Sequence, residues 1–224
     1  MRSTRRGVFV LSADPEVMFD GPADAARTIV LAHGAGAAMD SPFMNFVATG
    51  LGKRGFRVAR FEFPYMASKR ATGKGKPPDR EPVLREKWLR VVKMLGHEGL
   101  VIGGKSMGGR IASLIADDAE VAGLVCLGYP FHPTGKPERL RVEHLLTIKT
   151  PTLIVQGERD SFGSREEVAG YELSRRVRVV WMKDGDHSFK PRKSSGMTEA
   201  QNWEAALGEI VAFLEPAPGH SRTE

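Results

Sequence analysis

The chain has 224 residues, of which 41% are hydrophobic and 27% charged, and its formal net charge is +6 at pH 7. This length permits one large domain, and the apolar content can bury a sizeable core, which excludes a disordered chain. No stretch approaches the roughly 20 apolar residues that a membrane helix requires, and the first apolar run is too short for a secretory signal. The single Cys126 excludes an internal disulfide. We therefore expect a cytoplasmic protein with no membrane partner.

Short apolar, β-branched runs alternate along the chain with segments of helical periodicity. The expected strands are VFVLS from Val8, TIVLA from Thr28, FRVARF from Phe56, LVIGG from Leu100, AGLVCLG from Ala122, TLIVQG from Thr152 and VRVVWM from Val177. The expected helices cover residues 42–53, 83–95, 107–117, 138–146, 164–174 and 198–214. This alternation predicts a doubly wound, mostly parallel sheet in a three-layer α/β/α arrangement. We expect one domain over residues 1–215 and a flexible tail over residues 216–224.

Positive charge is concentrated in residues 66–80, which carry five cations and one anion. Such a segment can bind nucleic acid or steer an anionic substrate. It has no interleaved aromatic residues and no nucleic-acid motif, which argues against a nucleic-acid partner. We interpret it as a solvated loop, and an anionic ligand stays open as the alternative.

Residues 99–109 read GLVIGGKSMGG and match two unrelated signatures. The first eight fit the phosphate-binding P-loop, G-x-x-x-x-G-K-[ST], whereas residues 104–108 fit the nucleophile elbow of hydrolases, G-x-S-x-G. The variable residues of a P-loop form the loop itself, but here three of them are the apolar run LVI, which is typical of a buried strand. An elbow needs a strand, a serine at a sharp turn and a helix, and the sequence supplies all three. The stretch therefore predicts an elbow with Ser106 as the nucleophile.

Three side chains suited to acyl transfer follow expected strands. A serine hydroxyl needs an imidazole to accept its proton, and the imidazole needs an acid to fix its tautomer. The carboxyl ends of parallel strands meet at one edge of a sheet, where Ser106, Asp160 and His187 would lie in the chain order of α/β-hydrolases. Glu158 follows the same strand as Asp160 and is the alternative acid.

Six stretches together resemble a known superfamily: LAHGAG, FEFPY, GGKSMGGR, GYPFHPTGKPERLRVEHL, QGERDSFG and DGDHSF. They resemble α/β-hydrolases of the small, dienelactone-hydrolase-like branch. More narrowly, they are similar to the family of the testis-expressed hydrolase-like protein and subunit three of the non-specific-lethal complex. The resemblance covers residues 28–214 and implies the α/β-hydrolase fold. Its GxxDxFG pattern favours Asp160 over Glu158 as the acid.

An acyl-transfer site also needs backbone N–H groups that stabilise the developing oxyanion. One donor should be Met107, directly after the nucleophile at the positive end of its helix. The other should be Ala35 or Gly34 in the loop HGAG, where glycines allow an amide to turn inward. No metal-ligand spacing and no cofactor fingerprint is present, so we expect neither.

Residues 129–150 separate two expected strands and are too few for a cap domain, which predicts an open site for a small substrate. The expected wall of this site is Phe63, Tyr65, Met66 and Phe131, with His132 as a rim or substrate contact. Several neighbours have structural interpretations: Asp186 shapes a turn, Cys126 is a buried thiol, and Lys105 and Arg110 form ion pairs beside the elbow.

These observations predict a serine hydrolase that cleaves a small carboxylic ester or thioester through an acyl-enzyme on Ser106. Two alternatives stay open. A hydrolase fold can serve as a binding or scaffold protein with weak or no catalysis, because fold does not fix function. An acyltransferase would use the same three side chains with an acceptor other than water. The sequence does not fix the oligomeric state.

Overall fold

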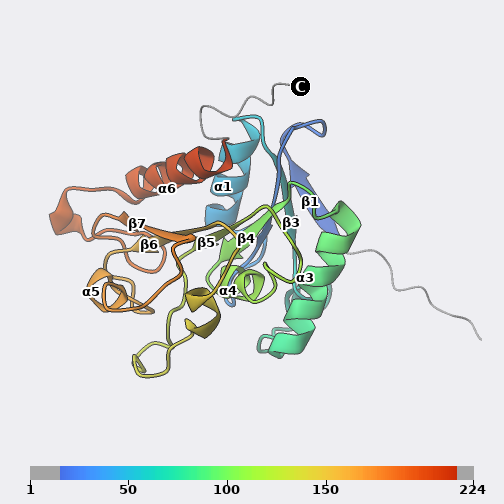
Figure 1. Ribbon diagram of the computed structural model, residues 1–224. Helices are drawn as coiled ribbons and strands as arrows, with labels where there is room; N and C mark the ends of the chain where they lie inside the picture. Colours follow the sequence, from blue (N-terminus) through green and yellow to red (C-terminus); the bar gives the residue numbers. More distant parts are fainter. Residues whose placement is uncertain (1–15, 216–224) are drawn as a thin grey trace, which may run out of the picture.

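The computed structural model describes residues 16–215, which form a seven-stranded sheet covered by helices on both faces (Figure 1). The strand order is β1-β3-β2-β4-β5-β6-β7, and all neighbouring strands are parallel except β1, which is antiparallel to β3. The strands are β1 (Val17–Asp20), β2 (Thr28–Ala32), β3 (Arg57–Phe61), β4 (Val101–Lys105), β5 (Gly123–Leu127), β6 (Thr152–Gly157) and β7 (Val177–Met182). The predicted α/β-hydrolase fold class is confirmed.

Two hydrophobic clusters lie on the two faces of the sheet. Helices α1 (Pro42–Gly52) and α6 (Glu199–Leu214) lie above the sheet in Figure 1, and α3 (Glu81–Leu95) and α4 (Met107–Ser113) lie below it. Side chains alternate between the faces along each strand, so Val101 of β4 packs with the α1 and α6 cluster whereas its neighbour Ile102 packs with the α3 and α4 cluster.

The structure differs from the sequence-based prediction in several shorter elements. The antiparallel strand β1 is not among the predicted strands. The predicted strand from Val8 and the predicted tail over residues 216–224 lie outside the described residues. Helix α4 is shorter than predicted because its last turn tightens into i→i−3 hydrogen bonds. Three further elements are short: α5 (Arg165–Val168), and the 3₁₀ turns η1 (Glu143–Leu146) and η2 (Lys193–Ser195). No helix within residues 16–215 is long and apolar enough to cross a membrane.

Half of the basic segment is a helix rather than a loop. Helix α2 (Pro64–Thr72) begins with a proline in its first turn and ends at Gly73, which has a positive φ of 72°. Both are ordinary helix-boundary signals. After it, the chain folds back, and the Asp79 carboxylate accepts a hydrogen bond from the Tyr65 N–H in the first turn of α2. Part of the charge is paired, because Arg70 bonds to the carboxylates of Asp40 and Glu62.

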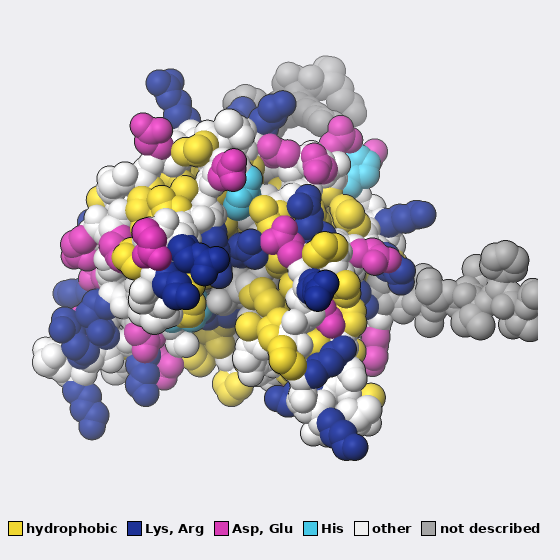
Figure 2. Space-filling model, turned by 90° about the horizontal axis from the view of Figure 1, so that it is seen from below, with side chains coloured by type: hydrophobic (Ala, Val, Ile, Leu, Met, Phe, Trp, Pro, Cys, Tyr) yellow, Lys and Arg dark blue, Asp and Glu magenta, His cyan; other side chains and the backbone are white. Residues whose placement is uncertain are grey.

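Positive charge does not form a continuous stripe on the lower face. Figure 2 shows Lys and Arg side chains scattered over this face, with Asp and Glu side chains among them. This distribution agrees with the interpretation of the basic residues as largely solvated charge.

The segment 129–150 packs into the core and does not form a cap over the sheet edge. Its only element is η1, and five of its apolar side chains belong to the hydrophobic cluster on the α3 and α4 side: Tyr129, Phe131, Val142, Leu145 and Ile148. The edge where the parallel strands end is therefore left open above the elbow.

Candidate active site

The chain makes a sharp, strained turn between β4 and α4. Ser106 occupies this turn with φ 51° and ψ −117°, a backbone conformation that is rare for a residue with a side chain. Strand β2 lies so close that a Cβ added to Gly104 would be 2.1 Å from the Ala32 carbonyl oxygen, and one added to Gly108 would be 2.4 Å from it. The two glycines therefore allow the close strand–helix approach that holds Ser106 at the apex, and the P-loop interpretation fails because its variable residues are buried strand.

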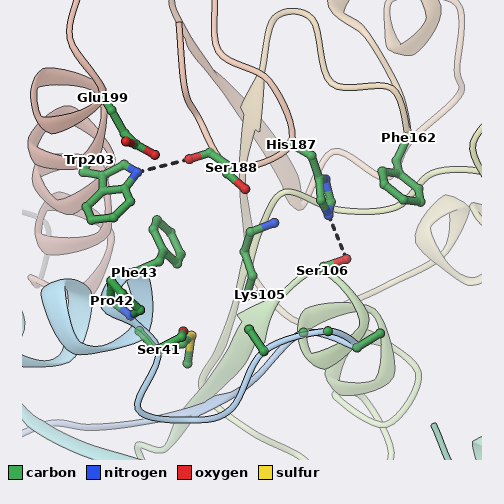
Figure 3. A pocket seen from close by; sticks show the side chains of 15 residues that line it. Ser41, Pro42, Phe43, Lys105, Ser106, Phe162, His187, Ser188, Glu199 and Trp203 are labelled. Atoms are coloured by element: carbon green, nitrogen blue, oxygen red, sulfur yellow. Dashed lines mark hydrogen bonds between the residues drawn. The ribbon is translucent and has the colours of Figure 1, made fainter. Parts of the chain in front are cut away.

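The structure brings Ser106, His187 and Asp160 into one chain of hydrogen bonds. The Ser106 Oγ lies 2.9 Å from the His187 Nε2 (Figure 3), and the His187 Nδ1 lies 2.8 Å from the Asp160 Oδ2. A carboxylate can only accept, so the Nδ1 donates to Asp160 and the Nε2 accepts the Ser106 proton. The Phe162 ring lies over the imidazole, with centroids 4.4 Å apart. The three side chains come from three separate loops at the carboxyl edge of the sheet.

The Asp160 carboxylate is fully buried and saturated with donors. Its Oδ1 accepts the Phe162 N–H at 2.9 Å, and its Oδ2 accepts the Gln156 Nε2 at 3.0 Å in addition to His187. Gln156 also donates to the Tyr129 carbonyl and accepts its N–H, which ties the ends of β5 and β6 together. This amide was not predicted as a site residue, although a glutamine inside the apolar strand TLIVQG was a signal for it.

The two other acids near the site have different partners. Glu158 accepts hydrogen bonds from Arg165 and from the Asp184 N–H, so it does not contact the imidazole. Asp186 accepts the N–H groups of Ser188 and Lys190 and shapes the turn that carries His187, as expected. No group of three or more His, Cys, Asp or Glu side chains within residues 16–215 is placed to hold a metal ion.

The loop after β2 is held in place by two buried side chains. The His33 Nε2 accepts the Phe63 N–H at 3.1 Å, so its Nδ1 carries the proton and donates to the Gly34 carbonyl at 2.7 Å. Burial lowers the pKa of His33, which keeps the ring neutral. The Tyr65 hydroxyl lies 2.8 Å from the Ala35 carbonyl oxygen and 3.3 Å from that of Gly34.

This anchoring has a geometric consequence for the amides. In a trans peptide the N–H points opposite to the preceding carbonyl. The Gly34 carbonyl is held by His33 and Tyr65, so the Ala35 N–H points away from these two side chains. Gly34 itself lies beside the nucleophile, since an added Cβ would be 3.6 Å from the Ser106 Cβ. The Met107 N–H, at the first position of α4, has no partner within its own helix.

A cavity of about 500 Å³ opens beside Ser106 on the α1 and α6 side of the sheet. Its walls come from the loop after β2, the start of α1, the end of β4, the loops of Phe162 and His187, and the start of α6. The large side chains among them are Phe43, Met44, Lys105, Phe162, His187, Glu199 and Trp203, most of them labelled in Figure 3. The cavity is thus mainly apolar and aromatic.

The side chains predicted to line the cavity lie elsewhere. Phe63, Tyr65, Met66 and Phe131 are buried in the core on the α3 and α4 side, where they pack against other side chains. His132 is also buried and borders a second cavity of about 860 Å³ around Arg159, Arg165 and Arg192. These residues follow the strands as predicted, but the direction in which their side chains point depends on how α2 and the segment 129–150 turn inward.

The actual cavity residues were missed for a related reason. Phe43 and Trp203 belong to α1 and α6, which are far from Ser106 in sequence and contact each other only in the folded chain; their rings lie 5.3 Å apart. Lys105 was expected to form an ion pair, and this is wrong: it has no hydrogen-bond partner among the described residues. Arg110 does form its expected pair, 2.8 Å from Glu81.

Comparison with known proteins agrees with this fold. The family model described as "Alpha/beta hydrolase domain" matches residues 25–215. Similar solved structures include an α/β serine hydrolase homologue from Coxiella burnetii, with 23% identity, a TM-score of 0.63 and 88% of each chain covered. A serine hydrolase without a lid from Xanthomonas campestris has 18% identity and a TM-score of 0.64 over 90% of each chain.

A third similar structure is a dienelactone hydrolase from Anabaena variabilis, with 20% identity and a TM-score of 0.65 over 88% of this chain and 90% of that one. At these identities the structural likeness shows a shared fold, whereas the family model covers most of the sequence itself. The chain therefore belongs to the α/β-hydrolase domain family.

Proposed function

We propose that this protein is a serine hydrolase that cleaves a small carboxylic ester or thioester through an acyl-enzyme on Ser106. The observation that carries the proposal is the hydrogen-bonded series Ser106–His187–Asp160 at the mouth of an apolar cavity. The fold family supports the hydrolase class, and an activated serine is suited to attack the carbonyl of an ester or thioester.

In this mechanism His187 accepts the Ser106 proton as Oγ attacks the substrate carbonyl. Asp160 holds the tautomer that leaves Nε2 free to accept, and it stabilises the imidazolium that forms. The imidazolium then returns the proton to the leaving alcohol or thiol, and the acyl group stays on Oγ. In the second half His187 takes a proton from a water as the water oxygen attacks the acyl carbonyl. The bond between the acyl carbon and Oγ then breaks, His187 returns the proton to Oγ, and the free acid leaves.

The negative charge on the carbonyl oxygen would be stabilised by two backbone amides, those of Met107 and Ala35. The Met107 N–H lies at the positive end of α4, and the Ala35 N–H belongs to the peptide whose carbonyl is held by His33 and Tyr65. Each such donor contributes about 10²–10³-fold to the rate of comparable enzymes. Tyr65, proposed from the sequence as a substrate contact, would instead act by positioning this loop.

The test is the intact mass of the protein after exposure to a fluorophosphonate, with Ser106→Ala as the matched variant. A single adduct on the wild type that is absent from the variant supports the proposal, and ester turnover should then fall at least about 10⁴-fold in Ser106→Ala. A folded wild type without an adduct would overturn the proposal and favour a binding or scaffold protein. Product analysis with added alcohol or amine acceptors distinguishes hydrolysis from acyl transfer.

The narrower resemblance to the family of the testis-expressed hydrolase-like protein belongs to the same proposal. It rests on the stretches quoted from the sequence, and it adds no substrate.

A further inference from the structure

Lys105 ends β4 directly before the nucleophile, and its side chain lies on the α1 and α6 side of the sheet. Residues 101, 103 and 105 of β4 share this face because side chains alternate along a strand. Figure 3 shows the Lys105 side chain standing between the Ser106–His187 pair and the rings of Phe43 and Trp203, with Nζ directed toward the loop of residues 187–188. Lys105 is thus part of the cavity wall that a bound acyl group would touch.

The Lys105 ammonium is buried and has no hydrogen-bond acceptor. Its Nζ is inaccessible to solvent, and no group in residues 16–215 accepts a hydrogen bond from it. The negative charges of Asp160 and Asp186 act on Lys105, but neither carboxylate bonds to it. Asp160 is bonded to His187 and Gln156, and Asp186 is bonded to backbone N–H groups. A buried charge without a partner is strongly unfavourable, and native proteins rarely leave one unexplained.

The space around Nζ is built to admit this side chain. A Cβ added to Gly128, at the end of β5, would be 2.8 Å from the Lys105 Nζ and 2.9 Å from the His187 carbonyl oxygen. Gly128 has a φ of 66°, so glycine suits this position in both conformation and size. The aliphatic part of Lys105 lines the cavity, and rotation about its four-carbon stem can carry Nζ to a ligand.

We propose that Lys105 is the specificity residue of this site and that the preferred substrate carries a carboxylate on its acyl group. The ligand carboxylate supplies the acceptor that the protein does not, and the chain between the carboxylate and the scissile carbonyl lies in the cavity, with the rings of Phe43 and Trp203 as the wall beyond Lys105. This inference rests on the proposed function, since it assigns an acyl group to the same site.

The other charged groups around the cavity agree with one anion at this position. Glu199, at the first turn of α6, is on the wall and Figure 3 places it beyond Ser188, on the Trp203 side, so its charge disfavours a second anion there. The cavity of about 500 Å³ suits an acyl group of modest size. A short half-ester of a dicarboxylic acid meets these conditions.

The protonation of Lys105 provides an independent readout. Burial lowers the pKa of Lys105 to about 8, and the negative charges of Asp160 and Asp186 act in the opposite direction. A bound carboxylate would raise this pKa again, because an opposite charge favours the ammonium. Below pH 8 binding would be independent of pH at this group. Above pH 8 binding would take up a proton, and affinity should fall by up to about tenfold per pH unit.

The first experiment compares kcat/KM for monomethyl glutarate with that for methyl 5-methylhexanoate, in which an isopropyl group replaces the carboxylate. The wild type should prefer the half-ester by about tenfold or more, and Lys105→Met should bring the ratio of the two values close to one or reverse it. Lys93→Met removes the same charge from an exposed position on α3 and should keep the wild-type ratio. A wild-type ratio near one, or equal loss of both activities in Lys105→Met, would overturn the inference.

The second experiment does not depend on turnover. Binding of monomethyl glutarate is measured by calorimetry at pH 8.5 in Ser106→Ala and in Ser106→Ala with Lys105→Met. Proton uptake with at least tenfold weaker binding in the double variant supports the inference even if the esterase proposal fails. Equal affinity in both proteins overturns the inference, while a fluorophosphonate adduct on wild-type Ser106 would leave the proposed hydrolase intact.

Discussion

Ser106 and Ser113 both contact a histidine ring at nearly the same distance, 2.9 Å to the His187 Nε2 and 2.8 Å to the His144 Nε2. The direction of the hydrogen bond differs between the two pairs: the serine donates in the first, and the histidine donates in the second. The His187 Nδ1 donates to Asp160, so its Nε2 is free to accept from Ser106. The Ser113 hydroxyl already donates to the Arg110 carbonyl at 2.6 Å, so the His144 Nε2 must be the donor. Ser113 therefore cannot be deprotonated by its histidine.

The surroundings of the two pairs differ in the same sense. Ser113 is buried within α4, next to the Tyr129 hydroxyl and beside the ion pair of Arg110 and Glu81. The polar groups of this network, on the α3 and α4 side, bond to one another and to backbone carbonyls, and they connect α4 with η1. Ser106 lies at a strained turn beside a cavity, and the cation next to it, Lys105, is unpaired among the described residues. A serine beside a histidine is thus a weak sign of catalysis until the acid, the tautomer and access are known.

The largest expected effect comes from giving His187 the wrong tautomer. In Asp160→Asn the amide can donate to Nδ1, so the proton moves to Nε2, as in His144. We expect ester hydrolysis to fall about 10⁴-fold, the size seen when the aspartate of a comparable triad becomes asparagine. Steady-state kinetics with an activated ester measures this, and circular dichroism checks the fold. Activity within tenfold of the wild type would contradict the assigned role of Asp160.

A smaller effect is expected from the loop after β2, which lies beside Ser106. Tyr65→Phe removes the hydroxyl that holds the Ala35 and Gly34 carbonyls, while the buried ring still packs in the core. We expect kcat to fall about tenfold with little change in KM, because a misplaced oxyanion donor weakens the transition state more than the ground state. Tyr129→Phe, which loses the hydroxyl beside His144 on the α3 and α4 side, is the matched control and should leave kcat within twofold. Equal losses in the two variants would reject a positioning role for Tyr65.

The smallest effect concerns the contribution of the Ser113–His144 pair to the stability of the fold. Burial lowers the pKa of His144 from 6.5 to about 4, so the folded protein binds fewer protons at this group than the unfolded chain does. Its contribution is present above pH 6.5 and is lost as the pH falls toward 4. We expect this group to lower the free energy of unfolding by about 1 kcal/mol between pH 7 and pH 5, after allowance for its partial exposure.

Urea denaturation at the two pH values, compared with His144→Gln, measures this contribution. The wild type should lose more stability than the variant over this range. The same loss in both proteins would show that His144 is not the responsible group.

The sequence alone predicted the parts of the molecule that depend on local pattern. Mostly apolar runs of five to seven residues indicated parallel strands, and six of the seven appear in the structure; the seventh, at Val8, lies outside the described residues. Glycines around Ser106 indicated the elbow because only a residue without a side chain allows so close an approach. The place of each side chain after a strand indicated which of them could meet at the sheet edge.

Tertiary structure decided which way the side chains at that edge point. The sequence analysis expected a loop where α2 forms, and only packing turns Tyr65 and Phe63 into the core and away from the cavity. Phe43 and Trp203 carried no sequence signal, because they meet through contacts between α1 and α6 across 160 residues of chain. The sequence suggested ion pairs for both Lys105 and Arg110, but only the tertiary structure decided that Arg110 pairs with Glu81 whereas Lys105 has no partner among the described residues. Local pattern places a residue at an edge, and long-range packing decides what it faces there.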